Sequence, residues 1–377
     1  MALSFKALLP LLLLSTASGA WADTTGSSDK DTTAGKHYTL GVYVLCDEAL
    51  TKALQGRDVK EYIGAFFNTI NLIFRRMPDP QVRFDVVELE DTSNMDTLKK
   101  AYAAARLSSN QYLYGLWPEH FNITKDGYMD GPSTANKLVQ YFTKTGEPYN
   151  NSHIIVLFTA RTLLRRRYPH DWKNATDKNY LFVDAHPKHG GICTEENLVI
   201  TYDNGHFSGL TYTARKLARL LGANYDYEKV KDCLYRTDML MGDIDKDSNS
   251  NYIMSPCTQK DLAESLGNAT KEGCLKRSFK SQVTSTQKLP ANIFNTDQYC
   301  AHVFPGKLNI AECTQEKWSL SLYPYAGTCE VRCCYGVIDS WKRNLFSMHI
   351  IPSLDGYPCS TEDVKSGICV KNVCEVK

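Results

Sequence analysis

Three cationic residues lie close together in one stretch of the chain, Arg215, Lys216 and Arg219. The residues around them predict an amphipathic helix, because an apolar stripe recurs at helical spacing through Leu210, Ala214, Leu217, Ala218 and Leu221. Gly222 follows this stripe, where a helix commonly closes with a left-handed residue. Arg215 and Arg219 are four residues apart and so share one helix face. Guanidinium and ammonium groups bind anions and offer no lone pair to a metal ion.

The same stretch resembles the zinc-binding helix of the metzincin proteases. Their motif is H-E-x-x-H-x-x-G-x-x-H, followed by a methionine turn beneath the zinc ion. Gly222, Asp226 and the turn Ile253-Met254-Ser255-Pro256 match this pattern. With Gly222 aligned, the resemblance assigns the three ligand positions to Arg215, Arg219 and Tyr225, and the general-base position to Lys216.

These replacements predict that the chain binds no zinc and has no catalytic residues. Zinc is bound in proteins by neutral imidazole, thiolate or carboxylate. A guanidinium stays protonated, and Lys216 accepts a proton only if its pKa is strongly lowered. The resemblance therefore indicates a pseudoenzyme, an inactive homologue of zinc metalloendopeptidases. The alternative is an ordinary basic helix in an unrelated protein.

Three cations at a former zinc site predict an electropositive cleft. Two resolutions of their mutual repulsion are open. In the favoured one, carboxylates of the same chain such as Asp226 or Asp245 bind the guanidinium groups. In the other, a sulfated glycan or an acidic protein segment docks there, because arginine binds such groups with two parallel hydrogen bonds.

The amino-terminal residues predict secretion. Residues 1–22 carry Lys6, an apolar run and Ala20-Trp-Ala22, as a cleavable signal peptide does, and the run is too short to span a membrane. Residues 23–36 are polar and predict a disordered leader. A net charge of +1 argues against a nucleic-acid binder. In a secreted chain, four sequons are candidate glycosylation sites: Asn122, Asn150, Asn174 and Asn268.

Between residues 37 and 280, segments with strand and helix patterns alternate. Strands are predicted at 38–45, 82–89, 154–158, 180–183 and 198–201, with an edge strand at 112–117. Helices are predicted from the Asp58 cap to about residue 75, after Ser93 or Asn94, and over 133–143. This alternation favours a three-layer α/β domain with a mixed, mostly parallel sheet.

The order of elements resembles the reprolysin (adamalysin) catalytic domain, and among such families the salivary metalloproteases of ticks. Gly190-Gly-Ile-Cys193, the Leu-Leu-Gly-Ala helix end and Tyr252-Ile-Met-Ser-Pro-Cys257 carry the resemblance over 37–280. Residues 281–377 form a small cysteine-rich module. Asp355-Gly-Tyr-Pro-Cys359 resembles the disintegrin-like and cysteine-rich ends of the ADAMTS group, although Tyr357 departs from that pattern.

Thirteen cysteines in a secreted chain predict disulfides and leave one thiol over. The reprolysin resemblance implies the pairs Cys193–Cys274 and Cys233–Cys257. The eight cysteines from Cys300 onward are expected to pair among themselves, in an order that the sequence does not fix. Cys46 is then the odd thiol, either buried and inert or linking two chains into a dimer.

One further stretch, Asp243–Asn251, resembles the start of an EF-hand loop. It has serine at the sixth position and Met254 at the twelfth, so a solvated loop is favoured, with structural calcium as the alternative. The resulting hypothesis is a secreted binding protein for an extracellular protein, matrix or glycan partner, with host targets if it is a tick-like salivary protein. An active metalloprotease with unrecognised ligands and a structural glycoprotein are the alternatives.

Overall fold

The computed structural model describes residues 36–91, 121–124, 127–145, 152–166, 180–182, 187–226, 239–242, 253–271, 273–279, 287–307, 309–313, 328–338, 344–361 and 363–376. Gly35–Lys377 forms one compact unit, distinct from Met1–Ala34. The predicted signal peptide, the helix after Ser93 and the edge strand at 112–117 lie outside the described residues. Within them, no helix is long and apolar enough to cross a membrane.

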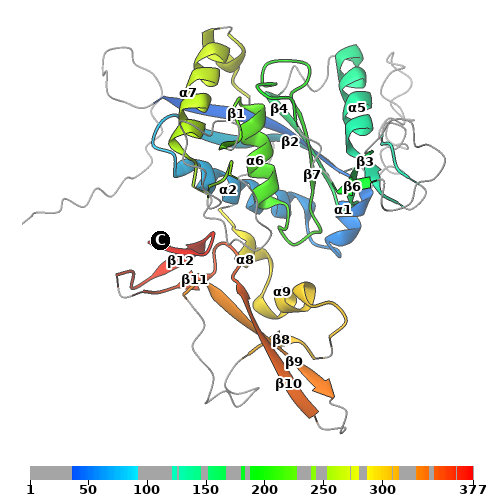
Figure 1. The fold of residues 1–377 in the computed structure, drawn as a ribbon, viewed down its shortest axis with the longest axis vertical. Coiled ribbons are helices and arrows are strands. Elements are labelled where there is room, and N and C mark those ends of the chain that lie inside the picture. The colour runs from blue at the N-terminus through cyan, green and yellow to red at the C-terminus, as the bar shows by residue number, and fades with distance from the viewer. Residues whose placement is uncertain are drawn as a thin grey trace, which may run out of the picture. The chain divides into compact units, whose positions relative to one another are not determined.

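A four-stranded parallel sheet forms the centre of the α/β region, as the alternating patterns predicted (Figure 1). Its strands are β1 (His37–Cys46), β2 (Gln81–Asp91), β4 (Ile154–Thr159) and β7 (Leu198–Tyr202), in the order β2-β1-β4-β7. All three neighbouring pairs are parallel. A small side sheet joins β3 (Met129–Asp130), β5 (Leu163–Arg166) and β6 (Tyr180–Phe182), in which β5 and β6 are antiparallel.

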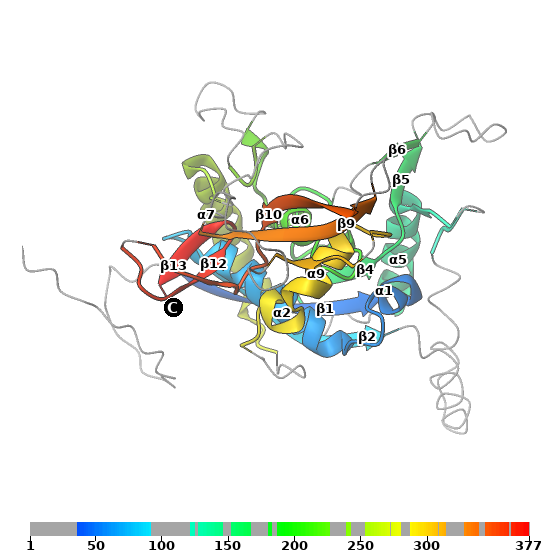
Figure 2. The same ribbon diagram turned by 90° about the horizontal axis from the view of Figure 1, so that it is seen from below.

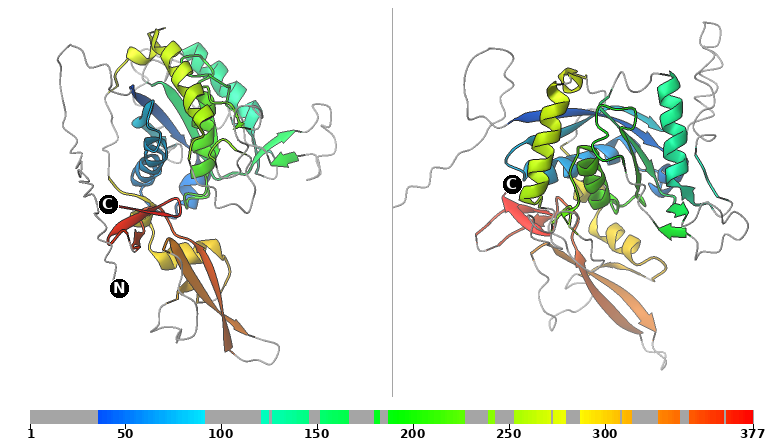
Figure 3. Two further views of the ribbon diagram at one scale, coloured as in Figure 1. Left: turned by 60° about the vertical axis from the view of Figure 1, so that its left-hand side comes forward. Right: turned by 45° about the horizontal axis from the view of Figure 1, so that its top comes forward.

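Helices cover both faces of the central sheet, which gives the three predicted layers. Even-numbered β1 residues such as Val42 pack with α2 (Val59–Arg75) and α6 (Leu210–Leu220). Odd-numbered ones such as Leu45 pack with α5 (Gly131–Thr145) on the other face (Figure 3). This division follows from the two-residue period of a strand. Every residue of β4 is buried, as expected for a strand covered on both sides.

Helix boundaries in this region follow local capping chemistry. Asp58 caps α2 by accepting hydrogen bonds from the amides of Lys60 and Glu61, 2.7 and 3.0 Å away. Asp47 caps α1 (Glu48–Ala53) in the same way through Leu50. After α6, the chain forms α7 (Pro256–Lys271) and the short 3₁₀ helix η4 (Cys274–Lys276).

The described part of the C-terminal region, which spans residues 287–376, forms two small antiparallel sheets and two helices (Figure 2). The helices are α8 (Pro290–Ile293) and α9 (Thr296–Val303). One sheet joins β8 (Ala311–Glu312), β9 (Glu330–Ile338) and β10 (Asn344–Pro352), and the other joins β11 (Pro358–Cys359), β12 (Gly367–Val370) and β13 (Val373–Val376). Among the residues described there, its own buried cluster contains Cys300, Val331 and Cys333.

Disulfides compensate for this small core. The eight cysteines from Cys300 onward pair among themselves, which confirms that prediction, as Cys300–Cys333, Cys313–Cys334, Cys329–Cys369 and Cys359–Cys374. In the α/β region Cys193 is bonded to Cys274, the pair that the resemblance implied. Cys257 is also in a disulfide, but Cys233 lies outside the described residues.

Cys46 forms no disulfide and is fully buried on β1. Burial, together with the nearby carboxylates Asp91, Asp47 and Asp203, raises the pKa of its thiol well above the ordinary value. Of the two alternatives predicted for Cys46, the structure therefore agrees with a buried, unreactive thiol. A dimer linked through Cys46 would need this thiol at the surface.

Candidate functional site

The helix that carries the cationic residues ends as its sequence predicted. Gly222 has a φ of +104°, and its amide donates to the carbonyl of Arg219 at 3.0 Å. The amide of Ala223 donates to the carbonyl of Ala218 at 2.9 Å. These two bonds make a Schellman cap, which turns the chain sharply and brings Tyr225 back beside the last turn of α6.

Both arginines of α6 lie against the ring of Tyr225. The guanidinium carbons of Arg215 and Arg219 are 5.1 and 4.8 Å from the ring centroid, within the range of cation–π attraction. Arg215 also donates from Nη1 to the carbonyl oxygen of Gly242 at 2.6 Å. Three of the four positions that the resemblance assigned to zinc chemistry thus pack against one another.

Lys216 points elsewhere. Its side chain is buried, with 2 % of the residue exposed, and its Nζ donates to the carbonyl oxygen of Ile200 on β7 at 2.5 Å. An ammonium group that donates to a main-chain carbonyl is held as a donor. It therefore lacks the lone pair that a general base needs.

The methionine turn contributes to the same buried core as Tyr225. Met254 is buried, with 3 % exposed, and belongs to the main core. Ser255 donates to Oδ1 of Asp226 at 2.6 Å, and the amide of Asp226 donates to the carbonyl oxygen of Met241 at 3.0 Å. Burial raises the pKa of Asp226, while its hydrogen bonds and the charge of Arg215 oppose the rise.

The expectation that chain carboxylates satisfy the arginines is met only in part. The structure gives Arg215 a carbonyl and an aromatic ring as partners, and it places Asp226 close enough for their charges to interact. Asp245 and the whole EF-hand-like stretch from Asp243 to Asn251 lie outside the described residues. The cations are therefore held by internal contacts, which lowers the case for an anion site in the cleft.

The side chains at these positions do not fit zinc. They supply two guanidinium groups, one ammonium group and one phenol, of which only the phenol has a usable lone pair. Among the described residues, one group of three potential ligand atoms lies within coordination distance, formed by Cys329, Cys359 and Cys369. All three are in disulfides, so they are not metal ligands either.

Comparisons with known proteins agree with the motif. No family model matches the chain. It is 21% identical over 259 residues to "A disintegrin and metalloproteinase with thrombospondin motifs like" of Bombyx mori, covering 64% of this chain and 33% of that protein. It is 24% identical over 246 residues to "Venom metalloproteinase 3" of Eulophus pennicornis, covering 63% and 52%. The chain is therefore similar to metalloproteinases of the reprolysin kind, as its motifs indicated.

The chain spans about a third to a half of the length of these relatives. A solved structure, metalloproteinase-II from Bacteroides fragilis, aligns over 63% of the reprolysin-like chain and 56% of its own, at 12% identity and a TM-score of 0.29. That likeness is too remote to support a functional statement. Neither curated relative comes from a tick, so the resemblance to tick saliva proteins stays a prediction.

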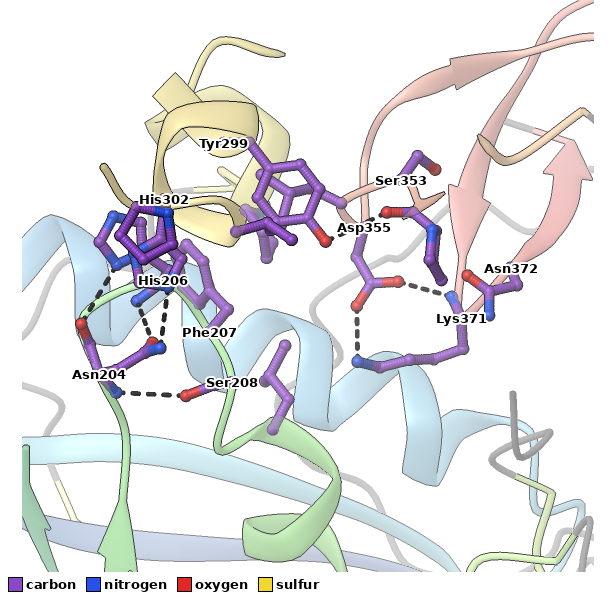
Figure 4. Close-up of a pocket in the computed structure, with 16 residues that line it drawn as sticks. Asn204, His206, Phe207, Ser208, Tyr299, His302, Ser353, Asp355, Lys371 and Asn372 are labelled. Atoms are coloured by element: carbon purple, nitrogen blue, oxygen red, sulfur yellow. Dashed lines mark hydrogen bonds and ion pairs between the residues drawn. The ribbon is translucent and has the colours of Figure 1, made fainter. Parts of the chain in front are cut away.

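A second candidate site lies at the opposite end of α6 (Figure 4). It is a pocket of about 620 Å³ between the β7–α6 loop, α9 and the ends of the C-terminal strands. His206 and His302 stack at one end, with ring centroids 3.2 Å apart. At the other end Asp355 and Lys371 form a buried ion pair of 2.9 Å. Sequence reasoning missed this pocket, because no motif links residues so far apart in the chain.

A buried network fixes the loop that forms one wall of the pocket. Asp203 accepts from the hydroxyl of Tyr62 at 2.5 Å and from the amides of Gly205 and Gly209 at 2.8 Å each. The same tyrosine hydroxyl accepts from the amide of Phe207 at 2.6 Å, which is held at a φ of +63°. Burial raises the pKa of Asp203, and these four hydrogen-bonding groups oppose the rise. The loop is thus anchored to α2 at several points.

The predicted glycosylation acceptors differ in their exposure. Asn268 is exposed on α7, and Asn122 is half-buried, with its amide 3.4 Å from Asp130. Asn150 and Asn174 lie outside the described residues.

Proposed function

We propose that this reprolysin-like chain is a secreted, catalytically inactive homologue that acts by binding an extracellular protein, matrix or glycan partner. The observation that carries the proposal is the packing of Arg215 and Arg219 on Tyr225 with Lys216 bonded to Ile200. Cationic side chains occupy two of the three ligand positions and the base position, and each has an internal partner. A protease would need these positions to bind zinc and to deprotonate water.

Secretion is supported by the signal-like residues 1–22, by the disulfides and by the names of the relatives. Binding is supported by the C-terminal region, whose bridges hold two small sheets with little core of their own. Such a region buries few of its residues, so many side chains remain at the surface, where a partner can contact them.

The first test is metal content. We expect purified full-length protein, equilibrated with zinc and then dialysed, to hold far less than one zinc per chain by elemental mass spectrometry. Casein and gelatin should stay intact with and without a chelator. Stoichiometric zinc with chelator-sensitive cleavage would overturn the proposal in favour of an active metalloendopeptidase.

A reconstructed site supplies the matched control. The variant R215H/K216E/R219H/Y225H restores the full donor set on the same scaffold. We expect it to bind about one zinc per chain in the same assay. For the binding role, immobilised protein should retain a specific component of plasma or extracellular matrix that survives competition by free protein. No such component in either source would favour a structural glycoprotein.

A further inference from the structure

The contact between His206 and His302 joins the two regions of the chain. His206 lies in the β7–α6 loop of the α/β region, and His302 lies on α9 of the C-terminal region (Figure 4). Their rings stack, and Asn204 bridges them: its Nδ2 is 2.8 Å from Nε2 of His302, and its carbonyl is 3.1 Å from Nδ1 of His206.

The bond from Asn204 requires the ring of His302 to be neutral, whereas Nδ1 of His206 donates to a carbonyl in either protonation state. Asn204 Nδ2 is a donor, so Nε2 of His302 must accept with its lone pair. A proton at that nitrogen would replace an attractive bond by a clash of two donors. Stacked imidazoles at this distance would also repel each other strongly if both were charged.

The surroundings add positive charge. The guanidinium of Arg57, from the loop before α2, lies 3.9 Å over the ring of Phe294, and that ring is 4.7 Å from His206. Burial, the neighbouring His302 and Arg57 lower the pKa of His206 to about 4. Burial and Arg57 also lower the pKa of His302.

The carboxylates near the pair are already engaged. Asp203 binds Tyr62 and two amides, and Asp355 binds the ammonium and the amide of Lys371. Glu61 on α2 is paired with Lys288. A proton arriving on either imidazole would therefore meet Arg57 and a second histidine, with these acids committed elsewhere.

We propose that His206, His302 and Asn204 form a histidine latch that holds α9 against the α/β region at neutral pH and releases it on acidification. This inference is independent of whether the chain binds zinc or a partner. Two other contacts across the same boundary involve no histidine. They are the ion pair of Arg76 with Glu375 and the bond from Asn68 to the carbonyl of Lys288 at 2.9 Å. Release is accordingly local to α9 and the pocket.

The direction of the pH effect follows from the linkage between proton binding and closure of the latch. A histidine with a lowered pKa binds its proton more readily in the released state, so the latch is fully closed above the ordinary pKa of 6.5. Its stability falls as the pH drops from 6.5 toward 4. For His206 alone, this shift reduces the ratio of closed to open latch about 30-fold at pH 5.

Nuclear magnetic resonance of the wild-type chain tests the latch without any substitution. Long-range ¹⁵N spectra of the imidazoles, recorded from pH 7.5 to 4, should show the ring of His206 still neutral below the ordinary pKa of 6.5 for as long as α9 stays ordered. Titration of both latch histidines near 6.5 with α9 still ordered would refute the latch.

Hydrogen exchange measured by mass spectrometry gives the second readout, after correction for intrinsic rates. Protection of α9 and of residues 204–208 should fall at least tenfold between pH 7 and 5. H206F/H302Q keeps a ring against Phe294 and an acceptor for Asn204 but cannot gain charge, so it should retain protection. H349F alters a histidine that stacks on Tyr335 within the C-terminal region and should behave as wild type. Equal losses in wild type and H206F/H302Q would sink the proposal.

Discussion

The two regions of this chain solve the problem of stability by different means. The α/β region buries large side chains on both faces of a parallel sheet, including Phe66, Phe74 and Phe158. The C-terminal region buries three residues in its own cluster and carries four disulfides. A large region can rely on apolar area removed from water, whereas a small one must restrict its unfolded state with covalent bridges. The comparison predicts that each region fails through a different kind of substitution.

The largest effect is expected in the core of the α/β region. Phe66 is fully buried on α2 and meets Phe158 of β4 edge-on, with centroids 4.8 Å apart. Phe66→Ala should lower the free energy of unfolding by about 3–5 kcal/mol, because it leaves a cavity between helix and sheet. Urea denaturation followed by far-ultraviolet circular dichroism measures this. Tyr212→Ala, at a residue 43% exposed, is the control and should change it by less than about 0.5 kcal/mol.

The next effect is expected from a bridge in the C-terminal region. Cys359 and Cys374 close a loop of 15 residues that ties β11 to β13. Replacing both by serine should destabilise this region by about 3 kcal/mol, through the freedom returned to the unfolded chain. Hydrogen exchange should show lost protection in β12 and β13 with β1 and β4 unchanged. Equal losses in the sheet of the α/β region would contradict the division.

A smaller effect on stability is expected from alanine substitutions at two glycines, one in each region. Gly222 has a φ of +104°, and an added Cβ would lie 2.5 Å from Oγ of Ser265. Gly336 on β9 has an ordinary φ and open space around it. Gly222→Ala should cost more than about 1 kcal/mol, whereas Gly336→Ala should be neutral or slightly stabilising. Thermal unfolding of the two variants, measured side by side, checks this, and similar costs at both positions would contradict it.

Elements fixed by local chemistry could be predicted from the sequence. Asp58 and the apolar face that follows it predicted α2, and Gly222 predicted the end of α6, because capping involves only neighbouring residues. The pairing of the last eight cysteines among themselves followed from composition. Their order did not, since it depends on which strands become neighbours.

The contacts of the candidate sites needed the fold. Lys216 finds its partner on β7, and Asn204 reaches His302 across 98 residues of sequence. A spacing of four predicted that Arg215 and Arg219 share a face, but it could not predict that both would stack on Tyr225. Side-chain direction depends on tertiary packing, which no periodicity records.

The contact of both arginines with the ring of Tyr225 also makes it difficult to restore the zinc motif by single substitutions. Changing Tyr225 to histidine removes the surface on which both guanidinium groups rest and places one imidazole between two cations. Changing one arginine to histidine instead provides a single zinc ligand beside the other, still charged, arginine. Each single substitution therefore loses packing without gaining zinc binding, because zinc needs several ligands together. On our proposal, each single substitution toward the zinc motif therefore lowers stability without restoring zinc binding, so activity would not be regained one substitution at a time.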